Sequence, residues 1–495
     1  MPVSIFNDVI GPVMRGPSSS HCAAALRIGR MARDLVVGSF DEVLVEFDRS
    51  GSLPTTHESQ GSDMGLFGGL LGWEAADERL PESRGALEAA GVRVRIDTVD
   101  AGDPHPNTYR LALSSPQGTT RLRAISTGGG MIEVIDIDGF PVAMGGDAHT
   151  TLVRADDDAP GKCLAGRAEV DEVRCHRRPD GSGGTLVEIR SLAPLAHDLV
   201  ERLRRVPGVT RVRSLAPVLP VLTPRGTVVP FSSARALLAR EGAAAEPLWK
   251  LADEYERARG GLAEGEPERM MVEIVRILRA SIARGIAGTH WDDRVLGWQS
   301  GGFDAALREG RLLDAGPLNR AILFVTALME VKSSMGVIVA MPTAGACAAL
   351  PGVVIALAES RGLDEAAMAR AFLAAGLVGV FIATPWTFAA EVGGCQAEGG
   401  AAAAMAAAAL VTLAGGPAER ALAAASMALQ SMIGLVCDPI ANRVEAPCLG
   451  KNVMAASNAL ACANMALAGF DEVIPFDEVV ETAARVAGQM PRELR

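Results

Sequence analysis

Hydrophobic and polar residues follow two different periods along this chain of 495 residues. In the first 145 residues, short apolar or alternating runs, which are typical of β-strands, are separated by segments with the spacing of helices. The strand-like runs cover 41–48, 92–99, 108–113 and 132–139, and helical spacing covers 21–37 and 63–72. This pattern predicts an α/β region over 1–145.

A second and smaller set of strand-like runs follows in residues 146–225. The runs lie near 150–154, 171–176 and 184–190, and helical spacing covers 195–205. We therefore expect a small α/β module there. The next stretch, "TPRGTVVP" at 223–230, has proline and glycine at its ends, so we expect it to be a linker.

From residue 231 onward, the strand-like runs disappear and only helical spacing remains. The segments with this spacing are 232–260, 266–286, 316–334, 345–359, 364–382, 398–414, 417–434, 450–468 and 476–489. The predicted fold is therefore an α/β N-terminal part followed by an all-α C-terminal domain over 231–495.

Three uncharged stretches in the C-terminal half are long enough to cross a membrane: 336–358, 371–390 and 399–418. They consist largely of alanine and glycine, the first two contain proline, and none has aromatic belts flanked by basic clusters. We interpret them as buried helices. The first twenty residues also lack the pattern of a signal peptide. These features predict a cytoplasmic protein that does not associate with membranes.

Composition narrows the class of protein further. Hydrophobic residues make up 49% and charged residues 21%, which is typical of globular proteins. The net charge of −12 argues against a nucleic-acid partner, because binding phosphates requires a basic face. Aromatic residues are only 4%, so the alanine- and glycine-rich helices must pack closely, and we expect a homodimer, the commonest symmetric assembly.

Three of the eight cysteines have neighbours that are unusual for a core thiol. Cys395 follows two glycines, and Cys437 and Cys448 bound the word "CDPIANRVEAPC". Glycine and proline hold such residues in turns, where a thiolate can point into a site. The spacing matches no zinc pattern, and three ligands leave one position open, which suits an iron–sulfur cluster that acts as a Lewis acid. Three buried structural cysteines are the alternative.

Six words along the chain resemble one family. They are "GPSSSH" (16–21), "HPNT" (105–108), "STGGG" (126–130), "SSMGVIVAMPTAGACAALPG" (333–352), "GGCQAE" (393–398) and "CDPIANRVEAPC" (437–448). In this order they resemble the iron–sulfur-dependent L-serine dehydratases. The resemblance implies a 4Fe-4S cluster held by Cys395, Cys437 and Cys448, with one iron left for substrate.

The remaining words supply candidates for substrate binding. Ser18, Ser19 and Ser20 precede a helical segment, where N-caps and free amide groups attract a carboxylate. The backbone amides of Gly128 and Gly129 are candidates for holding an anion, and Thr343 lies on a loop that opens a helix. His105 in "HPNT" is equally well explained as a turn residue.

One position departs from the family pattern. The family carries a histidine in a Gly-His-Gly-Thr-Asp segment, and that histidine is a candidate for the catalytic base. Here the segment reads "SQGSD" (59–63), with Gln60 in place of the histidine. Glutamine does not accept a proton at neutral pH, so His21 and His57 become the candidates for catalysis.

The resemblance implies an α,β-elimination that converts a β-hydroxy amino acid, L-serine, to a keto acid and ammonia. Two alternatives remain open: a related lyase that acts on another β-substituted amino acid, and an inactive amino-acid sensor that keeps the cluster fold. The expected partner is a small amino-acid substrate. The module at 146–225 resembles the regulatory amino-acid-binding modules that are fused to some members of the family.

Overall fold

The computed structural model describes residues 2–36, 38–164, 166–438, 440 and 443–494. The chain forms two compact units. The sheet unit is Ser20–Thr227, and the helical unit combines Met1–Ser19 with Val228–Arg495. Sheets and helices before residue 228 and helices after it confirm the predicted fold class. The proposed boundaries of three parts, 1–145, 146–225 and 231–495, stay a prediction.

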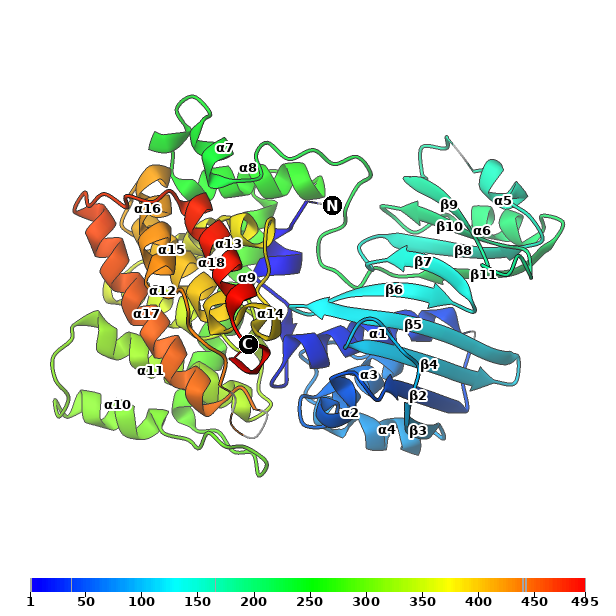
Figure 1. Cartoon of the computed structure of the whole chain (residues 1–495), viewed down its shortest axis with the longest axis horizontal. Helices are drawn as coiled ribbons and strands as arrows, with labels where there is room; N and C mark the ends of the chain where they lie inside the picture. The colour runs from blue at the N-terminus through cyan, green and yellow to red at the C-terminus, as the bar shows by residue number, and fades with distance from the viewer. Residues whose placement is uncertain (1, 37, 165, 439, 441–442, 495) are drawn as a thin grey trace. The chain divides into compact units, whose positions relative to one another are not determined.

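A six-stranded sheet forms the larger half of the sheet unit (Figure 1), in the order β3-β2-β4-β5-β6-β7. Its strands are β2 (Glu42–Asp48), β3 (Arg93–Val99), β4 (Thr108–Ser115), β5 (Gly118–Gly128), β6 (Met131–Ile137) and β7 (Phe140–Met144). The β2–β3 pair is parallel and the other pairs are antiparallel. The four predicted strands are confirmed, and β5 and β7 are additional.

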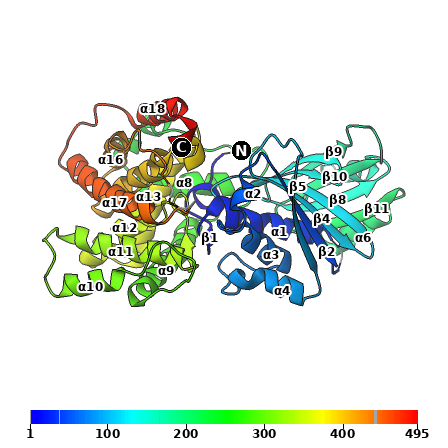
Figure 2. The same cartoon turned by 60° about the horizontal axis from the view of Figure 1, so that its bottom comes forward.

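Helices cover one face of this sheet (Figure 2). They are α1 (Ala24–Leu35), α2 (Leu53–Thr56), α3 (Ser62–Leu71) and α4 (Ser83–Ala89), with a short 3-10 turn η3 (Leu80–Glu82). Helices α1 and α3 pack backbone against backbone, because a Cβ atom at Gly69 would lie 2.1 Å from the carbonyl oxygen of Leu26. This close pair positions the segments that lead into both helices.

A four-stranded antiparallel sheet, in the order β11-β8-β10-β9, completes the sheet unit. Its elements are β8 (His149–Ala155), α5 (Ala159–Lys162), β9 (Glu172–Arg177), β10 (Thr185–Ser191), α6 (His197–Arg204) and β11 (Val209–Leu215). Alternate residues serve two cores, because Leu152 joins the core of the larger sheet while Val153 packs with Leu199 of α6. Strands β8, β9 and β10 and helix α6 lie close to their predicted positions, and α5 and β11 are additional.

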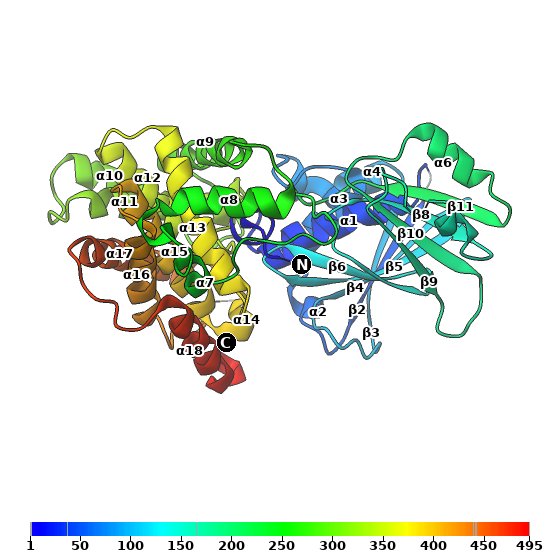
Figure 3. The ribbon, with the colours of Figure 1, turned by 90° about the horizontal axis from the view of Figure 1, so that it is seen from above.

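The helical unit surrounds one alanine-rich helix, α15 (Ala401–Leu413), which packs against α12, α13, α16 and α17 (Figure 1). The other helices and turns are α7 (Ala234–Leu238), η4 (Ala243–Ala245), α8 (Leu248–Gly260), α9 (Glu266–Ala287), α10 (Ser300–Arg308), α11 (Pro317–Ser333), α12 (Ala349–Ser360), α13 (Glu365–Ala383), α14 (Ala390–Gly393), η5 (Gln396–Gly400), α16 (Ala418–Gln430), α17 (Ala446–Leu467), α18 (Phe476–Gln489) and η6 (Arg492–Leu494). Small side chains let these helices approach closely. Figure 3 shows α8 and α9 along α13.

Within the described residues, α13 is the one helix that is long and apolar enough to cross a membrane, and 78% of its apolar window is buried inside the structure. Helices α12 and α15, which lie in the other uncharged stretches, are also almost completely buried. The helices in these segments are therefore buried, as interpreted, although the first segment also contains the strand at Ile338–Val339 and a loop.

The start of the chain is part of the helical unit. A five-residue π-turn, η1 (Ile5–Val9), packs on α13, and β1 (Val13–Met14) pairs with β12 (Ile338–Val339). Among the described residues after 231, β12 is the one strand, and with two residues it is too short to produce a recognisable alternation. Ser4 donates a hydrogen bond of 2.5 Å to the buried carboxylate of Glu256 on α8, which anchors this segment.

Candidate active site

In the sheet unit, three of the sequence words meet through hydrogen bonds. The Ser126 hydroxyl, in "STGGG", donates to the carbonyl oxygen of Ser20 in "GPSSSH" at 2.7 Å. The Ser126 amide donates to the carbonyl oxygen of Asn107 in "HPNT" at 3.1 Å. Asn107 in turn accepts a hydrogen bond from the hydroxyl of Ser52. Residues from four separate segments thus form one cluster.

His21 closes this cluster into a ring. Its Nε2 atom lies 3.0 Å from Thr56 Oγ1, and that hydroxyl donates to the carbonyl oxygen of Ser52 at 2.8 Å. Because the Thr56 proton is used, the contact assigns Nε2–H of His21 as the donor. Burial lowers the pKa of His21 to about 4. The imidazole is therefore neutral at pH 7 and fixed in orientation.

His57 lies next to Thr56 and has a carboxylate partner. Its Nδ1 atom lies 2.8 Å from Asp63 Oδ1, in the first turn of α3. This hydrogen bond raises the pKa of His57, against an opposing effect of burial. When Nδ1–H donates to the carboxylate, Nε2 keeps its lone pair and is the basic nitrogen. Gln60 lies between His57 and Asp63 in the sequence, and its backbone amide donates to the carbonyl oxygen of Thr56 at 2.9 Å.

The serine and glycine candidates occupy turns. Helix α1 has Ala23 as its N-cap, so no serine caps it, because a π-turn over Ser19–Ala23 intervenes. The division between the two units falls between Ser19 and Ser20, and Ser18 belongs with the helical unit. Gly128 ends β5 in a tight hairpin, where it and Gly129 have φ values of 104° and 60°, in the region that favours glycine.

In the helical unit, the structure brings the three candidate cysteines together. Cys395 immediately precedes η5, Cys437 lies in the loop after α16, and Cys448 lies in the first turn of α17. The thiols of Cys395 and Cys437 share a hydrogen bond, and both interact electrostatically with Cys448. The Lys451 ammonium lies 3.4 Å from Cys395 Sγ. The five remaining cysteines include exposed Cys163 and contribute nothing to this group among the described contacts.

The chemistry of this group fits an iron–sulfur cluster. The hydrogen bond with Cys437, together with burial, raises the pKa of Cys395, and burial raises the pKa of Cys448 to about 12. Thiolates there need a positive partner, which iron supplies when it replaces the protons. Among the described residues, no three His, Cys, Asp or Glu side chains are arranged around a single ion. A cluster with several irons can be held by thiolates that lie further apart than the ligands of a single ion, because each thiolate binds a different iron.

The cysteine loops are tied to each other through Gln396. The backbone amide of Gln396 donates to the carbonyl oxygen of Leu435 at 3.0 Å, and its side-chain oxygen accepts from the backbone amide of Gly434 at 2.9 Å. The amide of Cys437 itself donates to the carbonyl oxygen of Leu494 at 3.0 Å, near the end of the chain. Three hydrogen bonds therefore fix the turn that carries Cys437.

Thr343 is held at the same end of the helical unit by two residues that the sequence alone did not identify. Its hydroxyl donates to Glu398 Oε1 at 2.8 Å. Burial raises the pKa of Glu398 to about 7. Asn452 on α17 donates to the carbonyl oxygens of Gly345 and Cys448, at 2.8 Å and 2.7 Å. The Thr343 loop and the Cys448 turn are thereby joined by one side chain.

Comparison with known proteins finds similarity to one family. A family model described as "Serine dehydratase alpha chain" matches residues 239–495. The chain is 38% identical over 219 residues to the probable L-serine dehydratase alpha chain of Bacillus subtilis (strain 168), covering 44% of this chain and 73% of that protein. It is 35% identical over 250 residues to the L-serine dehydratase alpha chain of Peptoniphilus asaccharolyticus, covering 50% of this chain and 85% of that protein. It is also 40% identical over 154 residues to the probable L-serine dehydratase beta chain of Bacillus subtilis (strain 168), covering 31% of this chain and 69% of that protein.

The all-α region and these similarities define the class of protein as a lyase. The chain belongs to the L-serine dehydratase family and joins, in one polypeptide, regions similar to both the alpha and the beta chains. The resemblance seen in six short words of the sequence is thus confirmed.

Proposed function

We propose that this enzyme converts L-serine to pyruvate and ammonia by α,β-elimination, with a 4Fe-4S cluster. The observation that carries the proposal is the gathering of Cys395, Cys437 and Cys448 beside Lys451, in a chain of this family. The names of the relatives support L-serine as the substrate. The proposed setting is the cytoplasm, with neither a membrane nor nucleic acid as partner.

The three cysteines would hold the cluster, each through its thiolate. When bound, the cluster supplies a Lewis acid for the leaving hydroxyl group of the substrate. Lys451 places a positive charge beside Cys395, which stabilises a thiolate at that position. Thr343, oriented by Glu398, would bind substrate next to this group.

The proton steps use residues of the sheet unit. His57, held by Asp63, would accept the proton from Cα through Nε2 when its imidazole is neutral. Burial lowers the pKa of His21 to about 4, so its imidazole is a weak base, and we assign it to orienting the substrate. Ser18, Ser19 and Ser20, with the amides of Gly128 and Gly129, would bind the carboxylate. Loss of the Cα proton and the β-hydroxyl gives aminoacrylate, which hydrolyses to pyruvate and ammonia.

The test is anaerobic purification of the whole chain, followed by measurement of iron, sulfide, the absorption spectrum and pyruvate formed from L-serine. We expect Cys395→Ser, Cys437→Ser and Cys448→Ser each to lose iron and activity. Cys163→Ser is the matched control, because this exposed thiol lies outside the group and its loss should change neither. Equal iron in all four variants would refute the cluster.

The two alternatives make different predictions in the same assay. A related lyase would leave L-serine unchanged and release a keto acid from another β-substituted amino acid. An inactive sensor would be purified without iron or would release no keto acid from any amino acid. The relatives named L-serine dehydratase do not favour either alternative.

A further inference from the structure

A second concave site lies in the sheet unit, apart from the hydrogen-bonded ring that contains His21. It is a pocket of about 590 Å³ whose wall includes four arginines and one carboxylate. Arg121 lies on β5, Asp138 in the turn between β6 and β7, Arg154 on β8, and Arg211 on β11. Arg178 follows β9. This excess of positive charge stands out in a chain whose net charge is −12.

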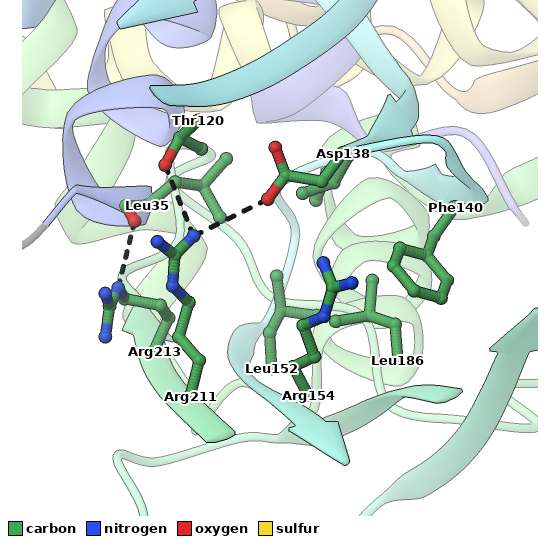
Figure 4. Close-up of a pocket in the computed structure, with 10 residues that line it drawn as sticks. Leu35, Thr120, Asp138, Phe140, Leu152, Arg154, Leu186, Arg211 and Arg213 are labelled. Atoms are coloured by element: carbon green, nitrogen blue, oxygen red, sulfur yellow. Dashed lines mark hydrogen bonds and ion pairs between the residues drawn. The ribbon is translucent and has the colours of Figure 1, made fainter. Parts of the chain in front are cut away.

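Only one of these arginines has a carboxylate partner. Arg211 Nη1 lies 3.5 Å from Asp138 Oδ2 and 3.3 Å from Thr120 Oγ1, as Figure 4 shows. Arg121, Arg154 and Arg178 form no ion pair within the part of the chain that the structure describes. Asp180 interacts electrostatically with Arg178 without forming an ion pair, so positive charge remains in excess around this pocket.

Two of these arginines, Arg154 and Arg178, are held in place. The guanidinium groups of Arg154 and Arg178 lie over the ring of Phe140, at 5.1 Å and 4.8 Å from its centre. Arg178 also donates two hydrogen bonds to the carbonyl oxygen of Asp138, at 3.1 Å and 2.7 Å. A pocket with fixed donors loses little side-chain entropy when it binds a ligand.

The sheet register adds a reason for a negative ligand. Arg154 on β8 lies directly opposite Arg211 on β11. Like charges in opposed positions of neighbouring strands repel each other and destabilise the sheet. An anion between them would remove that repulsion, whereas solvent alone only screens it.

We infer that this pocket binds a small anion that carries a phosphate group. Guanidinium groups match phosphate oxygens with paired donors, and several of them converge here. A zwitterionic amino acid is a poorer match, because its ammonium group would need an acceptor. Asp138 is the one carboxylate in the wall, and its oxygens already accept from the Arg121 amide, at 2.8 Å, and from Arg211. The ligand is therefore distinct from the proposed substrate.

Calorimetric titration of the full chain with inorganic phosphate tests this inference. Ionic strength is kept constant with chloride, because screening weakens all such contacts. We expect saturable binding at one site, weakened at least about tenfold in both Arg121→Gln and Arg178→Gln, as the loss of a charge-assisted contact predicts. Glycine, a small zwitterion, is expected not to displace phosphate.

The matched control is Arg93→Gln, an arginine on β3 of the same unit with a side chain that is 75% exposed. Its affinity for phosphate should equal that of the wild type. Arg121→Gln keeps the test valid if another variant fails to fold, because the Arg121 side chain is exposed, and its backbone amide and carbonyl, which bond with Asp138, are unchanged by the substitution. Equal affinity in all variants, displacement by glycine, or the absence of saturable binding would overturn the inference. None of these outcomes would affect the proposed dehydratase activity, which is measured separately.

Discussion

At the scale of single residues, the pair of His57 and Asp63 leads to a test of the proton acceptor. The hydrogen bond between them raises the pKa of His57, and Glu58 acts in the same direction, while burial and Arg84 oppose it. Only neutral imidazole accepts a proton, so activity should fall as pH drops through this raised pKa. Asp63→Asn lowers the pKa, so we expect the acidic limb of kcat/KM for L-serine to move to lower pH.

The control for this pH profile is Asp97→Asn, a carboxylate on β3 whose side chain is 42% exposed and pairs with Arg95. This variant should keep the acidic limb of kcat/KM at the same pH as in the wild type. His57→Ala should lower kcat by about 10²–10⁴, the usual contribution of a general base, with the iron content unchanged. If Asp63→Asn reduced the rate without moving the limb, His57 would not be the base.

The sequence identified candidate residues that have unusual neighbours along the chain, and it missed those that have ordinary neighbours along the chain. The glycines and prolines beside Cys395 and Cys437 predicted turns, and the structure brings these thiols together. Glu398 and Asn452 look like common residues of helical segments. Their importance depends on contacts with Thr343 and Gly345, which lie 55 and 107 residues away, and no local pattern reports such contacts.

At the scale of secondary-structure elements, two glycines of α13 receive the N-terminal segment. A Cβ atom at Gly376 would lie 2.4 Å from Ile5 Cγ2, and one at Gly379 would lie 2.2 Å from Val9 Cγ1. In an open helix, glycine to alanine is stabilising by about 1 kcal/mol. We expect Gly379→Ala instead to lower the unfolding free energy by about 1–3 kcal/mol, because it overpacks this contact.

Thermal or denaturant unfolding of the whole chain measures this effect. Gly302→Ala in α10 is the control, because a Cβ atom there meets nothing within 4 Å, so this variant should be as stable as the wild type or more stable. If both variants were stabilised alike, the N-terminal segment would not be packed on α13 as described.

The elements that the sequence failed to predict share a physical feature. Strand β5 contains threonine and arginine at many positions and ends in glycines, and β7 has only five residues. Helix α10 begins with "SGG", a poor start for a helix. These elements are fixed by pairing and packing with neighbours, as tertiary context overrides weak local preference.

At the scale of the whole molecule, the grouping of the chain into units depends on contacts that span hundreds of residues. Residues 1–19 were expected to belong to the α/β region that follows them, yet they group with helices after residue 228. Composition and periodicity describe a segment and its neighbours only. They do not indicate which distant helix a short apolar segment will join.

The expected homodimer also belongs to this scale. The alanine-rich helix α15 is buried within its own unit, so it does not supply the contact surface. Exposed apolar residues lie after α17 instead, and Phe470 is 53% exposed. Sedimentation at micromolar concentration should show a dimer that Phe470→Asp weakens, whereas Leu313→Asp, at a position 92% exposed before α11, should not. A monomeric wild type would contradict the prediction.

The place of η1 within the helical unit has a consequence for synthesis on the ribosome. Ile5, Phe6 and Val9 leave the ribosome before their partner helix α13, which lies about 370 residues later in the chain. At about 5–20 residues per second, these apolar side chains wait roughly 20–75 s for that helix. Throughout this interval the sheet unit can fold, while the segment in front of it stays exposed to chaperones and to other nascent chains. The helical unit therefore completes this part of its core only after α13 has been synthesised.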